Sequence, residues 1–159
     1  MSNKFEILMH QLDMPLEMRN SEAFLNAEIK KVLVHKVSRV WEFHFSFANI
    51  LPIEIFRELQ KRLAQEFSKT GNQAIFEIHC QAPQLSDELL QAYYQLAFEE
   101  GPCASHGFKS LYQDLRVHLD GDKLLIEGAS TIDTEHFRKN HLPNLSQQLV
   151  KYGFPQLTC

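Results

Sequence analysis

The most regular feature of the chain is an alternation of large aromatic and smaller or polar side chains over residues 39–49. The aromatic side chains occupy every second position: Trp41, Phe43, Phe45 and Phe47. Successive side chains of a β-strand point to opposite faces, so this period predicts a strand with one aromatic face. Burying the four rings stabilises the fold by at most about 6–12 kcal/mol, and a slip of one residue would expose all of them. The aromatic face is therefore expected to fix the register of this strand.

Hydrophobic periodicity predicts further elements around this strand, which together form a first unit over residues 1–81. Apolar positions three and four apart are typical of helices, β-branched or alternating runs are typical of strands, and proline or glycine marks their ends. The longest helix is expected to place its apolar stripe on the aromatic face. The other predicted elements are a helix before Pro15, a helical turn at residues 21–25, a strand from Ile29 joined to the aromatic strand as an antiparallel hairpin, a helix over residues 52–70 ended by Gly71, and a strand over residues 73–80.

The remaining sequence predicts a second unit over residues 82–159. Its clearest signal is Asp120-Gly121 between two apolar runs, because this dipeptide is typical of a tight type I′ hairpin turn. The predicted elements are a helix capped by Ser86, a short helix through Phe108 and Tyr112, a hairpin over residues 115–127, a helix from Asp133 that breaks at Pro143 and ends at Gly153, and a strand over residues 154–159.

Both units follow the order helix, hairpin, helix, strand, and this repetition indicates the fold class. We expect an α+β protein of two small KH-like units, each α-β-β-α-β, with antiparallel or mixed sheets covered by helices. KH domains grip a nucleic-acid backbone with a GXXG loop, and neither unit has one. The alternative is one continuous α+β domain whose halves resemble each other by coincidence.

Composition limits the classes of function. A chain of 159 residues with 44% hydrophobic and 23% charged side chains suffices for one ordinary domain or two small ones. Its net charge of −4 gives no overall attraction to phosphate backbones. We expect a cytoplasmic protein without membrane contact, because neither a signal peptide nor a bilayer-length apolar run is visible. The three cysteines form no CxxC pair and are expected to be free thiols.

Two predicted strands repeat a carboxylate–imidazole motif on the face opposite the aromatic side chains. Glu42 and His44 lie on one strand, and Glu77 and His79 lie on the next. Such side chains can bind zinc, but an exposed sheet face needs polar residues in any case, and this is the simpler interpretation. We therefore expect no metal or catalytic site, and take these four residues as candidate binding residues on an exposed sheet face. The sequence also contains no Walker loop and no GxGxxG motif.

Three runs of sequence resemble a known family: NSEAFLNAEIKKVLVHKVSRVWEFHFSFANILP (residues 20–52), HGFKSLYQDL (106–115) and KNHLPNL (139–145). With the rest of the chain they resemble the N-terminal region of the PolC-type DNA polymerase III α subunit, a bacterial replicative polymerase. The resemblance implies a truncated piece of a larger enzyme, whose OB, PHP, 3′–5′ exonuclease and polymerase domains follow. The acidic motifs of the family, and the Mg²⁺ expected for the full-length polymerase, belong to those domains, so no cofactor is expected here. The first unit is implied to be similar to the KH-like polymerase-binding domain of the clamp-loader τ subunit.

Sequence and resemblance together predict a non-catalytic interaction region that makes protein–protein contacts in the replisome, with the τ subunit as the candidate partner. One alternative is a module that binds single-stranded nucleic acid, suggested by the KH-like order and by basic residues near the first hairpin: Lys30, Lys31, Lys36 and Arg39. Another is a metal-dependent enzyme that uses Glu42, His44, Glu77 and His79.

Overall fold

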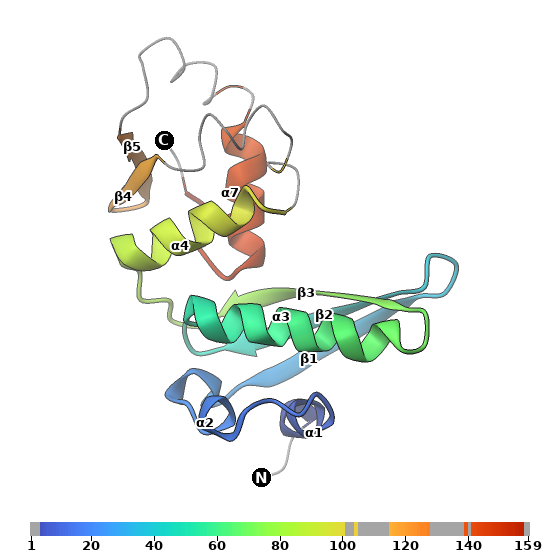
Figure 1. Ribbon diagram of the computed structural model, residues 1–159. Helices are drawn as coiled ribbons and strands as arrows, with labels where there is room; N and C mark the ends of the chain where they lie inside the picture. The colour runs from blue at the N-terminus through green and yellow to red at the C-terminus, as the bar shows by residue number, and fades with distance from the viewer. Residues whose placement is uncertain (1–3, 101–103, 105–114, 128–138, 140, 158–159) are drawn as a thin grey trace. The chain divides into compact units, whose positions relative to one another are not determined.

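The chain divides into two compact units, residues 1–83 and residues 84–159 (Figure 1). The structure is a computed structural model that describes residues 4–100, 104, 115–127, 139 and 141–157. In the described residues, the first unit has a three-stranded sheet and the second a two-stranded antiparallel sheet, each with helices. The α+β class predicted from the sequence is therefore confirmed.

The first unit contains the predicted helices and strands and one helix that was not predicted. Its elements are α1 (Lys4–Gln11), α2 (Leu16–Arg19), the 3-10 helix η1 (Glu22–Phe24), β1 (Glu28–His35), β2 (Val40–Phe47), α3 (Ile53–Ser68) and β3 (Gln73–Cys80). The additional helix is α2, which lies between the predicted helix before Pro15 and the predicted turn at residues 21–25. Pro15 precedes α2, and its restricted φ suits the start of a helix. The predicted turn at residues 21–25 is η1, which Ser21 caps by accepting the N–H of Ala23.

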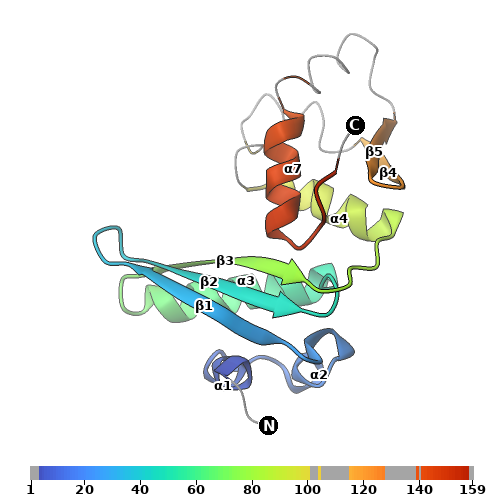
Figure 2. The same cartoon turned by 180° about the vertical axis from the view of Figure 1, so that it is seen from behind.

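The sheet of the first unit is mixed, in the order β1-β2-β3 (Figure 2). β1 pairs antiparallel with β2, as the hairpin prediction required, and β3 pairs parallel with β2. A parallel neighbour needs a crossover connection, which α3 supplies between β2 and β3. The resulting register sets Phe43 beside Val32 of β1 and Phe76 of β3.

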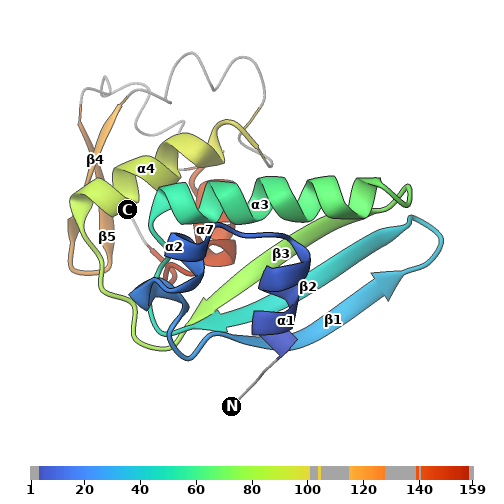
Figure 3. The same cartoon turned by 60° about the horizontal axis from the view of Figure 1, so that its bottom comes forward.

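Helices α1 and α3 both cover the aromatic face of this sheet (Figure 3). The Phe67 ring of α3 lies 5.2 Å from that of Trp41, and the Phe5 ring of α1 lies 5.6 Å from that of Phe45. Phe45 is 1% exposed. The prediction that the long helix packs on the aromatic face is confirmed, and α1 shares that face.

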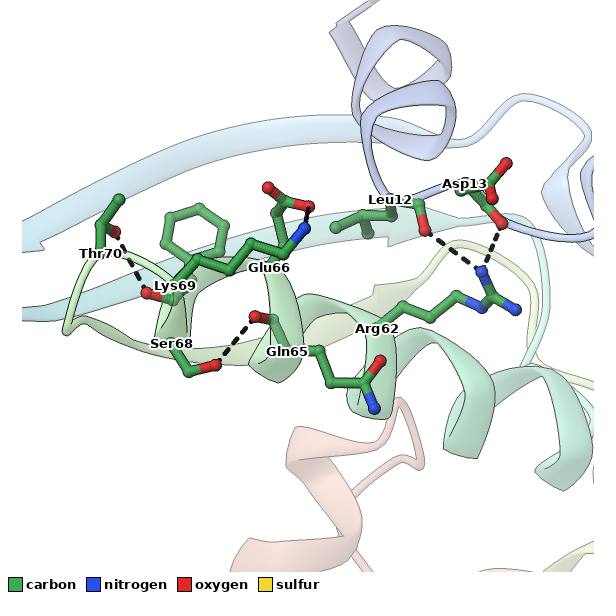
Figure 4. Close-up of polar contacts among 9 residues, drawn as sticks. Leu12, Asp13, Arg62, Gln65, Glu66, Ser68, Lys69 and Thr70 are labelled. Atoms are coloured by element: carbon green, nitrogen blue, oxygen red, sulfur yellow. Dashed lines mark hydrogen bonds and ion pairs between the residues drawn. The ribbon is translucent and has the colours of Figure 1, made fainter.

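An arginine of α3 holds the end of α1 in place (Figure 4). The Arg62 guanidinium donates hydrogen bonds to the backbone carbonyls of Leu12 and Asp13, which follow the last turn of α1. Glu58, one turn earlier on α3, accepts from Arg62 Nε at 2.6 Å and orients the side chain. Carbonyls at a helix C-terminus lack intrahelical partners, so this contact satisfies them and couples the two helices.

The C-terminus of α3 confirms the predicted role of Gly71. The N–H of Asn72 donates to the carbonyl of Phe67, and the N–H of Gly71 donates to that of Ser68. These two bonds define a Schellman motif, whose C′ residue must adopt a positive φ. Gly71 has a φ of 72°, which costs least for a residue without Cβ.

The second unit contains α4 (Asp87–Ala97), β4 (Arg116–Asp120), β5 (Lys123–Glu127) and α7 (Leu142–Lys151) in its described residues. Ser86 caps α4 as predicted, by accepting the N–H of Leu89 at 3.1 Å. Pro143 lies in the first turn of α7, where a helix tolerates proline. Aromatic rings join the helices, since Tyr93 of α4 lies 5.1 Å from Tyr152 between ring centroids.

Side chains of α4 occupy the outer edge of β4. Gln91 donates to the carbonyl of Leu115 and accepts the N–H of Val117, both at 2.9 Å. Asp87, one turn earlier, accepts the N–H of Leu119 at 2.8 Å. These bonds occupy backbone groups that would otherwise be open to pairing with another strand, so they protect this edge of the sheet from such pairing.

Two predictions for the second unit are wrong. The hairpin turn is formed by Gly121 and Asp122, because Asp120 still pairs with Lys123, and only Gly121 has a positive φ. That pattern is type II′ rather than type I′. Residues 154–157 form no strand; they follow α7 with Phe154 and Leu157 buried, and the Leu157 carbonyl accepts from Ser146 of α7. This segment packs on a helix instead of pairing with β5. The predicted short helix through Phe108 and the helix start at Asp133 lie outside the described residues.

Candidate functional site

The sheet face opposite the aromatic side chains carries the polar residues singled out from the sequence. Glu42 and His44 are two positions apart on β2 and therefore share this face. Parallel pairing sets Glu77 of β3 directly beside His44. His79 lies beside Ser46, two residue pairs further along the strands.

Three of the four predicted residues form a cluster. Glu42, His44 and Glu77 each offer a ligand atom within 4.8 Å of the others. Nε2 of His44 lies 2.5 Å from Oε2 of Glu42. All three side chains are half-buried, so the cluster is open to solvent but not fully hydrated.

A further imidazole joins the cluster from β1. Nε2 of His35 lies 3.4 Å from Oε1 of Glu42, the oxygen that His44 does not contact. In the antiparallel register of the hairpin His35 pairs with Val40, so its side chain reaches Glu42 diagonally across the two strands. His79 is exposed and is not part of the cluster.

The imidazoles stabilise the ionised form of Glu42. The hydrogen bond with His44 is the main cause that lowers the pKa of the Glu42 carboxyl below its usual value, and His35 adds to it. Desolvation of the half-buried carboxylate opposes this effect. Glu42 is therefore an ionised acceptor held between two histidines.

A surface pocket of about 780 Å³ lies at the other side of the first unit, between α1, the α2–η1 segment and the start of β1. The rings of Phe5 and Phe24, 5.1 Å apart, contribute to its wall. Leu16 and Leu25 also line it and are 62% and 64% exposed. Sequence analysis did not find this pocket, although two leucines without periodic partners in a connector were a signal for it.

Nucleophilic chemistry finds no support at the described cysteine. Cys80 is buried on β3, and burial raises the pKa of its thiol to about 11. A thiol with such a pKa is protonated at neutral pH and unreactive. Cys103 and Cys159 lie outside the described residues.

Two of the four basic residues near the first hairpin are already engaged within the chain. Lys30 pairs with Glu28 at 2.8 Å, and Arg39 donates to the carbonyl of Thr70 at 2.9 Å. Lys31 and Lys36 are exposed. The hairpin therefore offers fewer free cations than its sequence indicates.

Comparison with known families decides the identity of the chain. The family described as DNA polymerase III polC-type N-terminus I matches residues 4–78, and the one described as DNA polymerase III polC-type N-terminus II matches residues 92–159. The chain belongs to the N-terminal region of the PolC-type DNA polymerase III family. The resemblance stated from the three sequence runs is thus confirmed.

Curated PolC-type relatives match the chain over its whole length or nearly so. DNA polymerase III PolC-type of Streptococcus sanguinis (strain SK36) is 98% identical over 159 residues, and that of Streptococcus pneumoniae (strain D39) is 63% identical over 159 residues. That of Streptococcus pyogenes (strain Manfredo) is 51% identical over 158 residues, 99% of the chain. The chain spans 11% of the length of each of these relatives. No solved structure matches it.

Among the described residues, no helix combines the length and the apolar character needed to cross a bilayer.

Proposed function

We propose that this chain is a non-catalytic attachment region of a replicative DNA polymerase, which binds another protein of the replisome in the cytoplasm. The PolC-type family supports the polymerase context. A KH-like scaffold without a GXXG loop belongs to the same proposal. For the first unit it is supported by the order α1-α2-η1-β1-β2-α3-β3, in which helical elements precede a β-β-α-β run. The polymerase and exonuclease chemistry, with its Mg²⁺, is assigned to parts of the relatives that this chain does not span.

The observation that carries the proposal is the pocket beside α1. Its apolar wall and its two exposed leucines form a concave surface whose desolvation would favour binding of a protein side chain or helix. Arg19 and His10 line the same pocket, with Arg19 Nη1 3.0 Å from Nδ1 of His10. Glu6 and Glu28 line it as well, so the polar edge of the pocket carries charges of both signs. An apolar wall beside such an edge fits an amphipathic partner segment whose apolar face enters the pocket.

Exposed apolar side chains of the first unit also support the proposal of an attachment surface. Large hydrophobic residues that remain exposed in this unit are Ile7, Leu16, Leu25, Val32, Leu33, Val34, Val37 and Ile75. Only Leu125 and Val150 are in this class among the described residues of the second unit. The first unit is therefore the proposed attachment unit, with the clamp-loader τ subunit as the candidate partner.

Single-stranded nucleic acid is the competing ligand. The net charge of −4 and the internal pairing of Lys30 and Arg39 oppose this alternative, because binding to a phosphate backbone depends on free cations. A binding assay separates the two functions, since phosphate contacts weaken steeply with salt and apolar contacts do not.

The test titrates the labelled 159-residue chain with purified τ subunit and, in parallel, with a single-stranded oligonucleotide at low and high salt. We expect binding to τ that Leu16→Glu or Leu25→Glu weakens by about tenfold or more, because each places a charge in the apolar contact. The control is Leu125→Glu, which changes an exposed leucine of the second unit and should leave the affinity unchanged. Salt-sensitive oligonucleotide binding without τ binding would refute the proposal.

A further inference from the structure

The cluster on the polar sheet face has the composition of a transition-metal site. Two carboxylates and one imidazole lie within 4.8 Å of one another, and a second imidazole is 3.4 Å from Glu42. Imidazole nitrogen and carboxylate oxygen are the ligands that Zn²⁺ and similar divalent metals accept, usually with three or four protein ligands. The mixture of nitrogen and oxygen donors separates this group from the acidic patches common on protein surfaces.

The backbone presents these ligands from three strands. Glu42 and His44 come from the central strand β2, Glu77 from β3 and His35 from β1. The strand register fixes the positions of these ligands, because it pairs His44 with Glu77. Ring packing on the opposite, aromatic face holds that register. Donor atoms on rigid strands need small side-chain movements to close on a metal, so little ordering entropy opposes binding.

The two carboxylates of the cluster attract a cation, while Lys31 of β1, which pairs with His44, supplies one positive charge nearby. Glu42 and Glu77 bring two carboxylates to one half-buried spot, where mutual repulsion is less screened than in bulk water. In the metal-free protein, the imidazoles relieve this repulsion by hydrogen bonding to Glu42. A divalent metal would relieve it by binding both carboxylates directly.

We propose that Glu42, His44 and Glu77, with His35 as a fourth ligand, bind one divalent transition metal of the Zn²⁺ class. The metal would link β1, β2 and β3 on the face that helices α1 and α3 leave uncovered in the first unit. The role is structural, and no reaction is assigned to it. The proposal does not depend on the attachment function, because the pocket lies beside α1 and uses none of these residues.

The first test uses Co²⁺ as a spectroscopic probe on the metal-stripped 159-residue chain. Cys103 and Cys159 are changed to serine in this background, so that thiolates do not compete. We expect one bound Co²⁺ per chain, a ligand-field spectrum of nitrogen and oxygen donors without sulfur charge transfer, and displacement by Zn²⁺. A chain that binds no Co²⁺, or binds it with a sulfur spectrum, overturns the proposal.

Variants then locate the site. Glu42→Gln and His44→Gln should each weaken Co²⁺ binding by at least about tenfold, as loss of a ligand requires. The matched control is His79→Gln, which changes an exposed imidazole of the same face outside the cluster and should bind as the parent does. Equal affinities in the parent and both cluster variants, or an equal loss in the control, would refute the assignment.

A measurement on the unaltered chain covers the case in which a variant fails to fold. Addition of Zn²⁺ should shift the imidazole nitrogen resonances of His44 and His35 and leave those of His79 in place. It should also raise the unfolding temperature, because a ligand that binds the folded state stabilises it by mass action. Unshifted His44 resonances at saturating Zn²⁺ contradict the proposal.

Discussion

At the scale of single residues, the first unit depends on a few side chains that serve several backbone groups at once. Arg62 contacts two carbonyls after α1 and is itself oriented by Glu58. Its guanidinium offers five donors in a planar arrangement, which lysine cannot reproduce. The packing of α1 over the aromatic face therefore rests partly on one polar residue of α3.

Replacing Arg62 with methionine should lower the free energy of unfolding of the first unit by about 1–3 kcal/mol, because the part-buried bond to the Leu12 carbonyl and the exposed bond to that of Asp13 both lose their charged donor. Trp41 is the only tryptophan of the chain and packs against Phe67 of α3, so its fluorescence in urea reports this unit. Lys61→Met, at an exposed position of the same helix, is the control. Equal unfolding midpoints for the two variants would show that the hydrogen bonds of Arg62 add nothing to the stability of the first unit.

His118 links two acidic residues in the second unit. Its Nε2 lies 3.2 Å from the Glu127 carboxylate and its Nδ1 lies 3.4 Å from that of Asp87. The hydrogen bond with Glu127 is the main cause that raises the pKa of His118 above its ordinary value of 6.5, and the hydrogen bond with Asp87 is the second. Both carboxylates therefore favour the protonated form of this imidazole in the folded hairpin.

The stability contributed by His118 should be fully present below pH 6.5 and lost as pH rises through the raised pKa, because only the protonated imidazole attracts both carboxylates. Amide hydrogen exchange of β4 across this range measures the effect. His118→Gln should remove the pH dependence in this window. An NMR titration that places the pKa of His118 at or below 6.5 would contradict the account.

At the scale of elements, strands and helices with strong periodicity were predictable. The alternation around Trp41 gave β2 and its face, and the stripe that ends at Gly71 gave α3, because burial of one face leaves a period in the sequence. The parallel pairing of β3, and with it the position of Glu77 beside His44, depends on a crossover that no local pattern encodes. The sequence could predict that the four candidate residues share one sheet face. It could not predict that three of them form a cluster and that His79 lies outside it.

The errors at this scale have physical causes. Asp120-Gly121 is a turn dipeptide, but strand pairing continues through Asp120, so the turn moves on by one residue. The apolar residues after α7 suggested a strand, yet Phe154 and Leu157 are buried without strand pairing. Strand pairing overrides the local preference in the first case, and tertiary packing overrides it in the second.

The edge of β4 offers a test at the scale of elements. Gln91→Leu keeps the side-chain size but leaves the Leu115 carbonyl and the Val117 N–H without their partner. The free energy of opening at Val117, measured by amide exchange, should fall by about 1–3 kcal/mol. Gln147→Leu, at an exposed position of α7, is the control. Unchanged exchange of Val117 in Gln91→Leu would show that α4 does not protect this edge.

At the scale of the whole molecule, the chain joins two α+β units of one polymerase family, and the features that suit protein contact lie in the first. The pocket beside α1 and most of the exposed apolar residues belong to residues 1–83. The same unit carries the proposed metal ligands on its other sheet face. Attachment and metal binding would therefore use separate surfaces of one small sheet.

The central claim is that this region attaches the polymerase and takes no part in its chemistry. The most direct measurement compares the full-length polymerase with a form that lacks residues 1–83, in nucleotide incorporation on a short primed template and in retention of the τ subunit. We predict incorporation within about twofold of the intact enzyme and τ retention weakened by about tenfold or more. Loss of incorporation with τ retention unchanged would contradict the account.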